Sequence, residues 1–374
     1  MNSRASATDF GGRAVREALL DSGVSNGDIE EAYVGNVAGT AQDQTGVIGQ
    51  AVLREVGVTG IPITRVENAC ASSTCAFREA YKTVKSGSCD IALVLGVEKM
   101  SGVPTEVALK DMSGASDAQV EGAMGMTFMG VYGMRASTYM DRFGDVREEL
   151  ADIAVKNHAN GRANPHAHLH LDIDREDVLE SRRIAAPIRL LDACPMSDGA
   201  AAAVIAPGAV AEELVDDPVY VDAVEMSSGH YLDSDREYWR EELDERVAKR
   251  AYDEASVGPD DLDIVEVHDA ATIGELMHYE GLGLADYGEG AELVRNGDVM
   301  RDGRIPVNPS GGLKSRGHPV GATGVAQLCE LVWQLREEAG PRQVEDPSIG
   351  LAQNSGGALL GEGGVSTVTI LSTR

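Results

Sequence analysis

The chain has 374 residues, 43% of them hydrophobic, and carries a formal net charge of −29 at pH 7. This length allows a large buried core, and the strong negative charge argues against nucleic acids and anionic membranes as partners. The sequence contains no apolar run long enough to span a bilayer, so we expect a protein that does not enter the membrane.

Cysteine content and the N-terminus bear on the cellular compartment. The five cysteines are irregularly spaced without a C-x-x-C pair, which predicts neither a metal site nor a disulfide framework. Residues 1–10 are polar and lack the apolar core of a secretion signal. Together these features predict a reducing, cytoplasmic location. The acidic clusters are typical of a salt-adapted, halophilic surface, and an alternative is that they bind a basic partner.

The first predicted elements lead to a cysteine. Residues 12–20 read as a helix, residues 61–66 as a strand and residues 71–84 as a second helix. Cys70 lies between that strand and that helix, so unpaired helix amides face it. Such amides lower the pKa of a thiol and can hold a developing oxyanion, which favours a nucleophile. The alternative is a small buried hydrophobic residue.

Two histidines occupy positions that favour catalysis. His318 follows a glycine-rich loop and precedes a predicted helix whose apolar residues recur at helical spacing over 325–335. His268 ends the apolar run 264–267, and polar side chains at the carboxyl end of a strand form the sites of α/β proteins. We therefore expect Cys70, His268 and His318 to form one site.

The chain contains a degenerate internal repeat. Residues 18–35 align without gaps on residues 251–268, and both segments read as helix, turn and strand. The alignment predicts two similar α/β halves. Cys70 would come from the first half and both histidines from the second, so the site would lie between the halves.

Several ordered motifs resemble those of the thiolase family over nearly the whole chain, closest to its sterol-carrier-protein-type and archaeal branch. Cys70 stands where the family carries its acylated cysteine, and His318 where it carries the histidine that activates that cysteine. The matching motifs are N-A-C-A-S-S at 68–73, K-N-H-A-N-G-R-A-N-P at 156–165, C-P-M-S-D-G-A-A-A-A at 194–203, H-D-A-A at 268–271 and G-H-P-V-G-A-T-G at 317–324.

The resemblance implies a fold and its division. We expect duplicated α/β halves in a layered α-β-α-β-α sandwich, the first half over residues 1–207 and the second over 217–374. Residues 104–186 would form an inserted loop domain over the substrate. Thiolases open with a strand, whereas this chain begins with a predicted helix, so the leading strand is expected to be missing and a sheet edge uncovered.

The chain departs from the family at the second catalytic cysteine. Asn354 occupies the position of that cysteine in the C-terminal motif, and Ala270 occupies the alternative position in H-D-A-A. We therefore expect His268 to take over proton transfer at the α-carbon. Asn354 and Gly356 are predicted to contribute to substrate binding and the oxyanion hole, the latter through its backbone amide.

The implied activity is acyl transfer between coenzyme A thioesters through an acyl-cysteine, either Claisen condensation or thiolysis, in lipid metabolism. It needs no metal and no redox cofactor, since coenzyme A belongs to the substrate. Basic residues such as Lys314 and Arg316 could offset the repulsion of this anionic carrier, and an equal alternative is that they are solvent-facing charges. The resemblance further implies a homodimer or dimer of dimers, and a small partner subunit with an OB fold and a zinc ribbon.

Three other functions stay open on the sequence alone. A hydroxymethylglutaryl-CoA synthase and a ketoacyl synthase also use a cysteine–histidine pair on this fold. A non-catalytic scaffold or lipid-carrier subunit is the alternative of a different class, and the two absent cysteines favour it.

Overall fold

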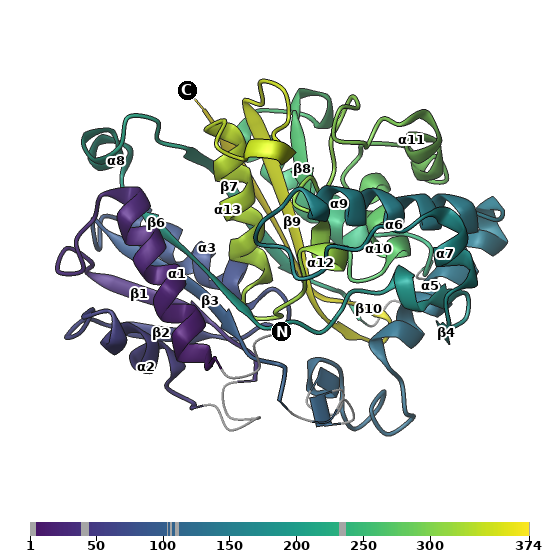
Figure 1. The fold of residues 1–374 in the computed structure, drawn as a ribbon, viewed down its shortest axis with the longest axis horizontal. Helices are drawn as coiled ribbons and strands as arrows, with labels where there is room; N and C mark the ends of the chain where they lie inside the picture. The colour runs from purple at the N-terminus through teal and green to yellow at the C-terminus, as the bar shows by residue number, and fades with distance from the viewer. Residues whose placement is uncertain are drawn as a thin grey trace.

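The computed structural model describes residues 5–373, except for 39–44, 103, 105–106, 109–111 and 232–236. Two four-stranded sheets form its centre, one from each half of the chain (Figure 1). The main elements before the second sheet are α1 (Ala7–Ser22), β1 (Glu31–Gly35), α2 (Ile48–Glu55), β2 (Ile63–Val66), α3 (Ser72–Lys85), β3 (Ala92–Glu98), α5 (Phe128–Phe143), α6 (Arg147–Arg162), α7 (Arg175–Glu180), β4 (Arg183–Ala185), β5 (Ile188–Arg189), β6 (Gly199–Ile205) and α8 (Gly208–Leu214).

The second half continues with the other sheet and its helices. Its elements are β7 (Tyr220–Ser228), α9 (Glu242–Ala255), β8 (Ile264–Glu266), α10 (Thr272–Gly281), α11 (Gly290–Asn296), α12 (Gly312–Ser315), α13 (Thr323–Leu335), β9 (Ile349–Leu359) and β10 (Glu362–Ser372).

The two sheets have partly equivalent pairings. The first has the order β2-β1-β3-β6, with β1 parallel to both β2 and β3 and with β6 antiparallel to β3. The second has the order β7-β10-β9-β8, with β8 parallel to β9 and β10 antiparallel to β9 and β7. The aligned repeat segments form α1–β1 and α9–β8, so the sequence repeat corresponds to a repeat of structure.

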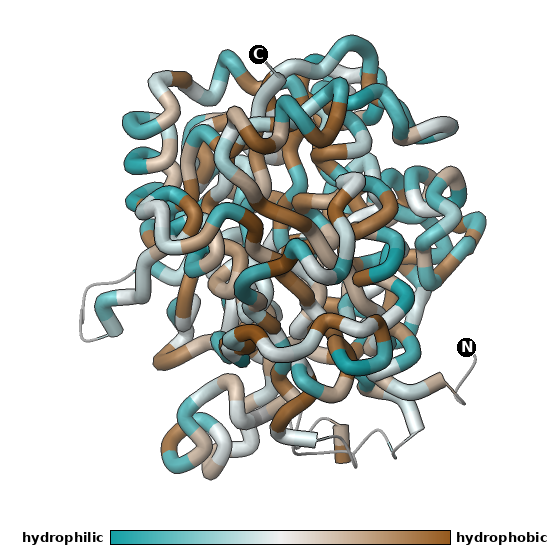
Figure 2. Tube along the Cα trace, turned by 90° about the vertical axis from the view of Figure 1, so that its left-hand side faces the viewer, coloured by the Kyte–Doolittle hydropathy of each residue, from teal (hydrophilic) through white to brown (hydrophobic). Residues whose placement is uncertain are grey.

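Helices form a central layer and two outer layers. One apolar cluster joins α3, through Phe77, to α13, through Leu328, and includes residues of both sheets, so these two helices lie between the sheets. A second cluster packs α1 and α2 on the outer side of the first sheet, and a third packs α9 and α10 on the second sheet. Hydrophobic stretches accordingly run through the interior of the trace (Figure 2). The expected α-β-α-β-α sandwich is confirmed.

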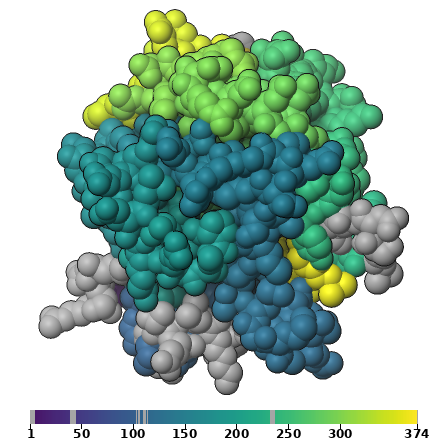
Figure 3. All heavy atoms as spheres, turned by 90° about the vertical axis from the view of Figure 1, so that its right-hand side faces the viewer, coloured from purple at the N-terminus to yellow at the C-terminus, as the bar shows by residue number. Residues whose placement is uncertain are grey.

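The segment between β3 and β6 contains α5, α6, α7 and the β4–β5 hairpin, and it spreads over one face of the molecule (Figure 3). It is anchored to the second half by buried polar groups. The Nζ of Lys156 on α6 lies 2.7 Å from Oε1 of Glu275 on α10. The amide of Asn157 donates to carboxylates of both Asp269 and Glu275. These contacts fix the inserted segment against the loop that follows His268.

One edge of the first sheet, at β6, is left without a further strand among the described residues. Within the described residues no strand precedes α1, and β6 has no counterpart of β7 on its open side. A cavity of about 1130 Å³ lies along that edge, lined by residues of α1, β6 and α13 that include Ala14, Ala201 and Leu328. This cavity is separate from the three predicted catalytic residues, none of which lines it. Among the described helices, none has both the length and the apolar character needed to cross a bilayer.

Candidate active site

Cys70 lies in a tight turn that joins β2 to α3. The amide of Ala71 donates to the carbonyl of Asn68 at 3.1 Å, and the amide of Ser72 donates to the carbonyl of Ala69 at 3.1 Å. Ala69 has a φ of 48°, a left-handed conformation that is costly for a residue other than glycine. The turn therefore forces the chain to present Cys70, which is 7% exposed, at the start of the central helix.

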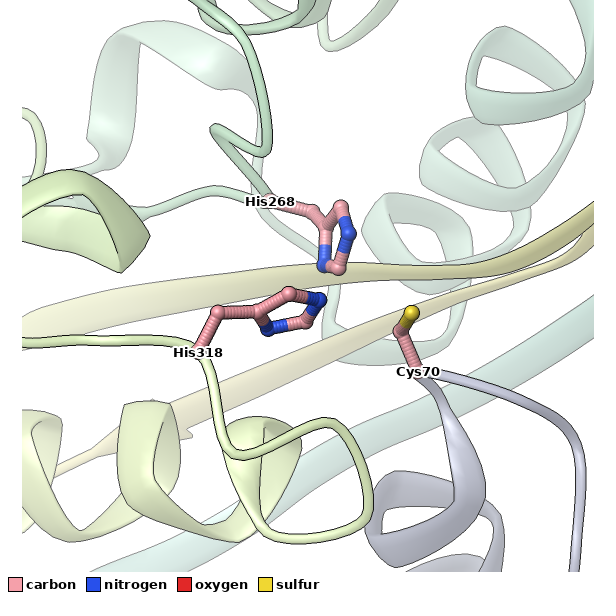
Figure 4. A group of neighbouring side chains, drawn as sticks. All are labelled: Cys70, His268 and His318. Atoms are coloured by element: carbon pink, nitrogen blue, oxygen red, sulfur yellow. The ribbon is translucent and has the colours of Figure 1, made fainter. Parts of the chain in front are cut away.

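The three predicted catalytic side chains converge at the junction of the halves (Figure 4). Ligand atoms of Cys70, His268 and His318 all lie within 4.8 Å of one another, and all three residues are buried. The two imidazole centroids are 5.0 Å apart with ring planes at 81°. This arrangement offers a nucleophile and two proton-transfer or hydrogen-bonding groups in one small volume.

The thiol of Cys70 is neutral at rest. Burial raises its pKa to about 12, and a negative charge on Cys194 or Glu98 would raise it further. The backbone amides of Gly357 and Cys70 hydrogen-bond the sulfur and oppose this shift. The sequence-based expectation of a lowered pKa was wrong, because loss of water around a buried thiol outweighs two amide hydrogen bonds. Attack must therefore be accompanied by transfer of the thiol proton to a base.

His318 is oriented to be that base. Its Nδ1 lies 2.7 Å from Oγ1 of Thr323, and this hydroxyl donates to the carbonyl of Pro319 at 3.1 Å. A hydroxyl that already donates accepts from the ring, so Nδ1 carries the proton and Nε2 keeps a free lone pair. Burial and the charge of Arg316 lower the pKa of His318 to about 3, which keeps the imidazole neutral.

His268 is also neutral, and its ring is held by Asn354. Burial lowers the pKa of His268, and the positive charges of His278 and Arg316, together with that of His318 whenever it is protonated, add to this effect. Its Nδ1 lies 3.1 Å from Nδ2 of Asn354, whose Oδ1 lies 3.1 Å from the hydroxyl of Thr74. Asn354 is fully buried and its side chain is occupied by these two contacts. The structure therefore places the Asn354 side chain against His268 and Thr74.

The two consecutive glycines near Cys70 have different roles. A Cβ on Gly356 would lie 2.2 Å from the carbonyl oxygen of Asn68 and 2.8 Å from the nitrogen of Ala71, so only glycine fits against the Cys70 turn. Gly357, with a φ of 67°, supplies the amide that bonds the Cys70 sulfur. Sequence reasoning named Gly356 and missed Gly357, although the G-G pair was a visible signal.

Sequence reasoning also missed several supporting residues. Cys194 lies between the two histidine loops, since its amide donates to the carbonyl of Ala270 at 3.0 Å and Met196 forms a backbone bridge with His318. Glu98, at the end of β3, accepts from the amide of Gly321 at 3.1 Å in the loop that follows His318. The C-P-M-S-D-G motif could have directed attention to Cys194, whereas nothing near Glu98 in the sequence indicated its contact.

Lys314 and Arg316 are not available for coenzyme A. The Nζ of Lys314 is fully buried and donates to the backbone carbonyls of Asp192 and Asp269. Arg316 is paired with Glu266 at 3.4 Å, and its side chain is 8% exposed. The expectation that they offset the charge of the substrate was wrong, because both cations satisfy buried acceptors that lie far away in the sequence.

Two groups of side chains have spacings that could hold a metal ion in the described part of the chain. One is Cys70, His268 and His318, a thiolate–imidazole set of the kind that binds zinc. The other is Glu241, Asp244 and His278. In the second group Asp244 is paired with His278 at 2.5 Å and Glu241 with Arg135 at 2.7 Å, so these ligands are already engaged.

Comparison with known proteins shows the family of the chain. The family description "Thiolase, N-terminal domain" matches residues 1–209, and "Thiolase C-terminal domain-like" matches residues 226–373. An acetyl-CoA acetyltransferase of Methanothermobacter thermautotrophicus is 43% identical over 95% of this chain and 91% of its own length. Its namesake from Methanocaldococcus jannaschii is 38% identical over 96% and 92%. Bovine sterol carrier protein 2 is 34% identical over 97% of this chain and 67% of its own length.

A solved structure described as "Ltp2-ChsH2(DUF35) aldolase" has the same fold. It superposes with a TM-score of 0.84 at 23% identity and covers all of this chain and 94% of its own. Family, fold and the three converging side chains agree, and the chain belongs to the thiolase family of acyl-CoA acyltransferases.

Proposed function

We propose that the protein transfers acetyl groups between coenzyme A thioesters through an acyl-cysteine at Cys70, by Claisen condensation or by the reverse thiolysis. The convergence of Cys70, His268 and His318 within 4.8 Å supports the proposal most directly. A scaffold would not need these groups buried together, since burial of polar side chains costs free energy.

The first half-reaction uses His318. Its unprotonated Nε2 takes the proton of Cys70 as the sulfur attacks the thioester carbonyl, and it then gives that proton to the departing coenzyme A thiolate. The amides of Cys70 and Gly357 point at the sulfur and suit the developing oxyanion. Gly356 stays a candidate for this role through its own backbone amide.

The second half-reaction depends on His268. The amide of Asn354 donates to Nδ1 of His268, so Nε2 carries the ring proton and acts as a donor in the site. We propose that as a donor it stabilises the enolate oxygen formed when the α-proton is removed, in place of the proton transfer first expected of His268. His318, neutral again after coenzyme A leaves, accepts that proton. The enolate carbon then attacks the acetyl carbonyl on Cys70, the C–S bond breaks, and His318 returns the proton to the departing Cys70 sulfur. Neither Asn354 nor Ala270 is ionisable, so the second cysteine of other thiolases has no direct substitute at its two usual positions.

The experiment that tests this proposal separates the half-reactions. We expect His268→Ala to form acetyl-Cys70 from acetyl-CoA at near wild-type rate but to make almost no acetoacetyl-CoA, because acylation needs only His318 and the backbone amides. Mass spectrometry of the adduct and a product assay measure the two steps. Label on another cysteine, or condensation at the wild-type rate by His268→Ala, would contradict the proposal.

We further propose an assembly and a setting. The homo-oligomer and the small OB-fold and zinc-ribbon subunit are those implied by the family. The similar aldolase structure, whose description pairs Ltp2 with ChsH2(DUF35), supports a second subunit. The net charge of −29 supports a salt-rich cytoplasm. Co-expression with a candidate zinc-ribbon protein, followed by size-exclusion chromatography, tests the assembly.

A further inference from the structure

The backbone of His268 is held by side chains rather than by the sheet. The chain leaves β8 at Glu266 and turns so tightly that the amide of Asp269 donates to the carbonyl of Val267 at 3.1 Å. The amide of His268 donates to Oε1 of Gln353 at 3.0 Å. Its carbonyl lies 3.1 Å from Nε2 of His278. The backbone that carries the imidazole is therefore held by these two side chains.

Both contacts converge on one carboxylate. Nδ1 of His278 lies 2.5 Å from Oδ2 of Asp244, and Nε2 of Gln353 donates to Oδ1 of Asp244 at 3.1 Å. Ser366 also donates to Oδ1, at 2.6 Å. A closed ring of hydrogen bonds thus runs from the His268 amide through Gln353, Asp244 and His278 back to the His268 carbonyl. Its members come from α9, α10, β9 and the loop that follows β8, and all four are buried.

The geometry also fixes the charge of His278. Each of its ring nitrogens faces an oxygen that accepts, the carboxylate of Asp244 on one side and the carbonyl of His268 on the other. Both nitrogens must therefore donate, so the ring is an imidazolium. Burial alone would lower the pKa of His278, but Asp244 raises it on balance. Burial alone would raise the pKa of Asp244, but His278 lowers it on balance.

We propose that Asp244 and His278 are positioning residues that hold His268 for the condensation half-reaction. The proposal rests on the role given above to His268. A displacement of about 1 Å in a catalytic group can cost roughly a hundredfold in rate. His318 is held separately by Thr323 and Ser197, so loss of the ring should leave acylation of Cys70 intact.

A purely structural ion pair would behave differently. The charged groups that face His278 are Asp244 on α9, Glu241 before that helix, Arg135 on α5 and, when protonated, His268. If the pair served stability alone, its removal would lower the melting temperature and reduce both half-reactions equally. Positioning predicts an unequal loss.

The test compares His278→Leu, which removes both donors, with His278→Gln, whose amide can still donate to the His268 carbonyl. We expect His278→Leu to acetylate Cys70 within about twofold of wild type. Its condensation kcat should fall at least about tenfold, with little change in KM for the second acetyl-CoA. His278→Gln should recover most of the condensation rate. The matched control is Glu280→Gln, a buried carboxyl on the same helix that bonds Tyr139 and the amides of Gly288 and Gly290.

Two further variants keep each outcome decisive. His278→Leu leaves the carboxylate of Asp244 buried without its cation, so the double variant Asp244→Asn/His278→Leu removes both charges and is expected to fold. Equal loss of both half-reactions in a folded variant, or condensation at the wild-type rate, would overturn the positioning role. His268→Ala is assayed in parallel. If His268→Ala condenses normally, the proposed role of His268 is wrong. If His268→Ala does not condense but His278→Leu condenses normally, only the positioning proposal is wrong.

Discussion

Gly356→Ala tests whether the Cys70 turn tolerates movement. The new Cβ would lie 2.2 Å from the carbonyl oxygen of Asn68, 2.8 Å from the nitrogen of Ala71 and 3.0 Å from its Cβ, whereas ordinary contacts begin at 3.4 Å. The obstacles at Asn68 and Ala71 nitrogen are backbone atoms, which cannot rotate away as a flexible side chain does. Strand β9 or the turn must therefore shift by roughly 1 Å.

The size of the effect follows from what the turn carries. Asn68 and Ala71 flank Cys70, so a shift there moves the sulfur relative to His318. We expect acylation to slow by roughly a hundredfold, since a displacement of about 1 Å in a reacting group has this effect. Overpacking should also lower the free energy of unfolding by about 1–3 kcal/mol.

The assay follows acetyl-Cys70 formation from acetyl-CoA by rapid quench and mass spectrometry, together with thermal unfolding. Gly363→Ala, on the neighbouring strand, is the matched control, because its Cβ would meet only the flexible side chain of Leu243 at 3.3 Å. If Gly356→Ala acylates at the wild-type rate while it melts normally, the close packing of the turn does not position Cys70 and the reasoning is wrong.

Three further predictions concern His318 and the charged surface. Thr323→Val should slow acylation by roughly ten- to a hundredfold, because Nδ1 of His318 loses its hydrogen-bond partner. The control Thr369→Val removes a buried hydroxyl that bonds none of the described residues, and it should leave the acylation rate unchanged. Because the folded pKa of His318 is about 3 and the ordinary value 6.5, its stabilising contribution is complete above pH 6.5 and lost as the pH falls toward 3. Acylation should accordingly have no acid limb near pH 6.5, and a limb there would contradict a neutral His318. Thermal stability should fall steeply from molar to millimolar potassium chloride, and a flat response would assign the acidity to a partner.

The sequence predicted elements whose pattern is local. The helix expected over 325–335 lies within Thr323–Leu335, and the strand expected over 61–66 contains Ile63–Val66. The convergence of Cys70, His268 and His318 followed from motifs at strand and helix ends together with the resemblance. These features depend on residues that are adjacent in the sequence and on the topology of the duplicated halves. Both can be recognised in the sequence, as a periodicity of apolar residues and as an internal repeat.

What could not be predicted depends on distant partners. The direction of the Cys70 pKa shift depends on how completely water is excluded, which no local motif encodes. Lys314 was expected near the substrate, but its ammonium group donates a hydrogen bond to the backbone carbonyl of Asp192, 122 positions away in the sequence. Nothing in the sequence around His278 indicates its contact with Asp244, which lies on another helix. Buried polar partners of this kind follow from three-dimensional packing alone.

The replacement of the second cysteine by Asn354 changes the chemistry that this position supports. A cysteine offers a thiol that exchanges protons, whereas the amide bridges Thr74 and Nδ1 of His268 and exchanges none. The amide makes these contacts through two separate polar atoms, Oδ1 toward Thr74 and Nδ2 toward His268, whereas a cysteine has a single sulfur. With the amide present the tautomer of His268 is defined, and with the Asp244 network its backbone is fixed. Loss of the thiol and immobilisation of His268 are thus physically linked. Where a cysteine sulfur would shuttle a proton, Nδ2 of Asn354 instead orients the His268 ring so that its Nε2 donates into the site.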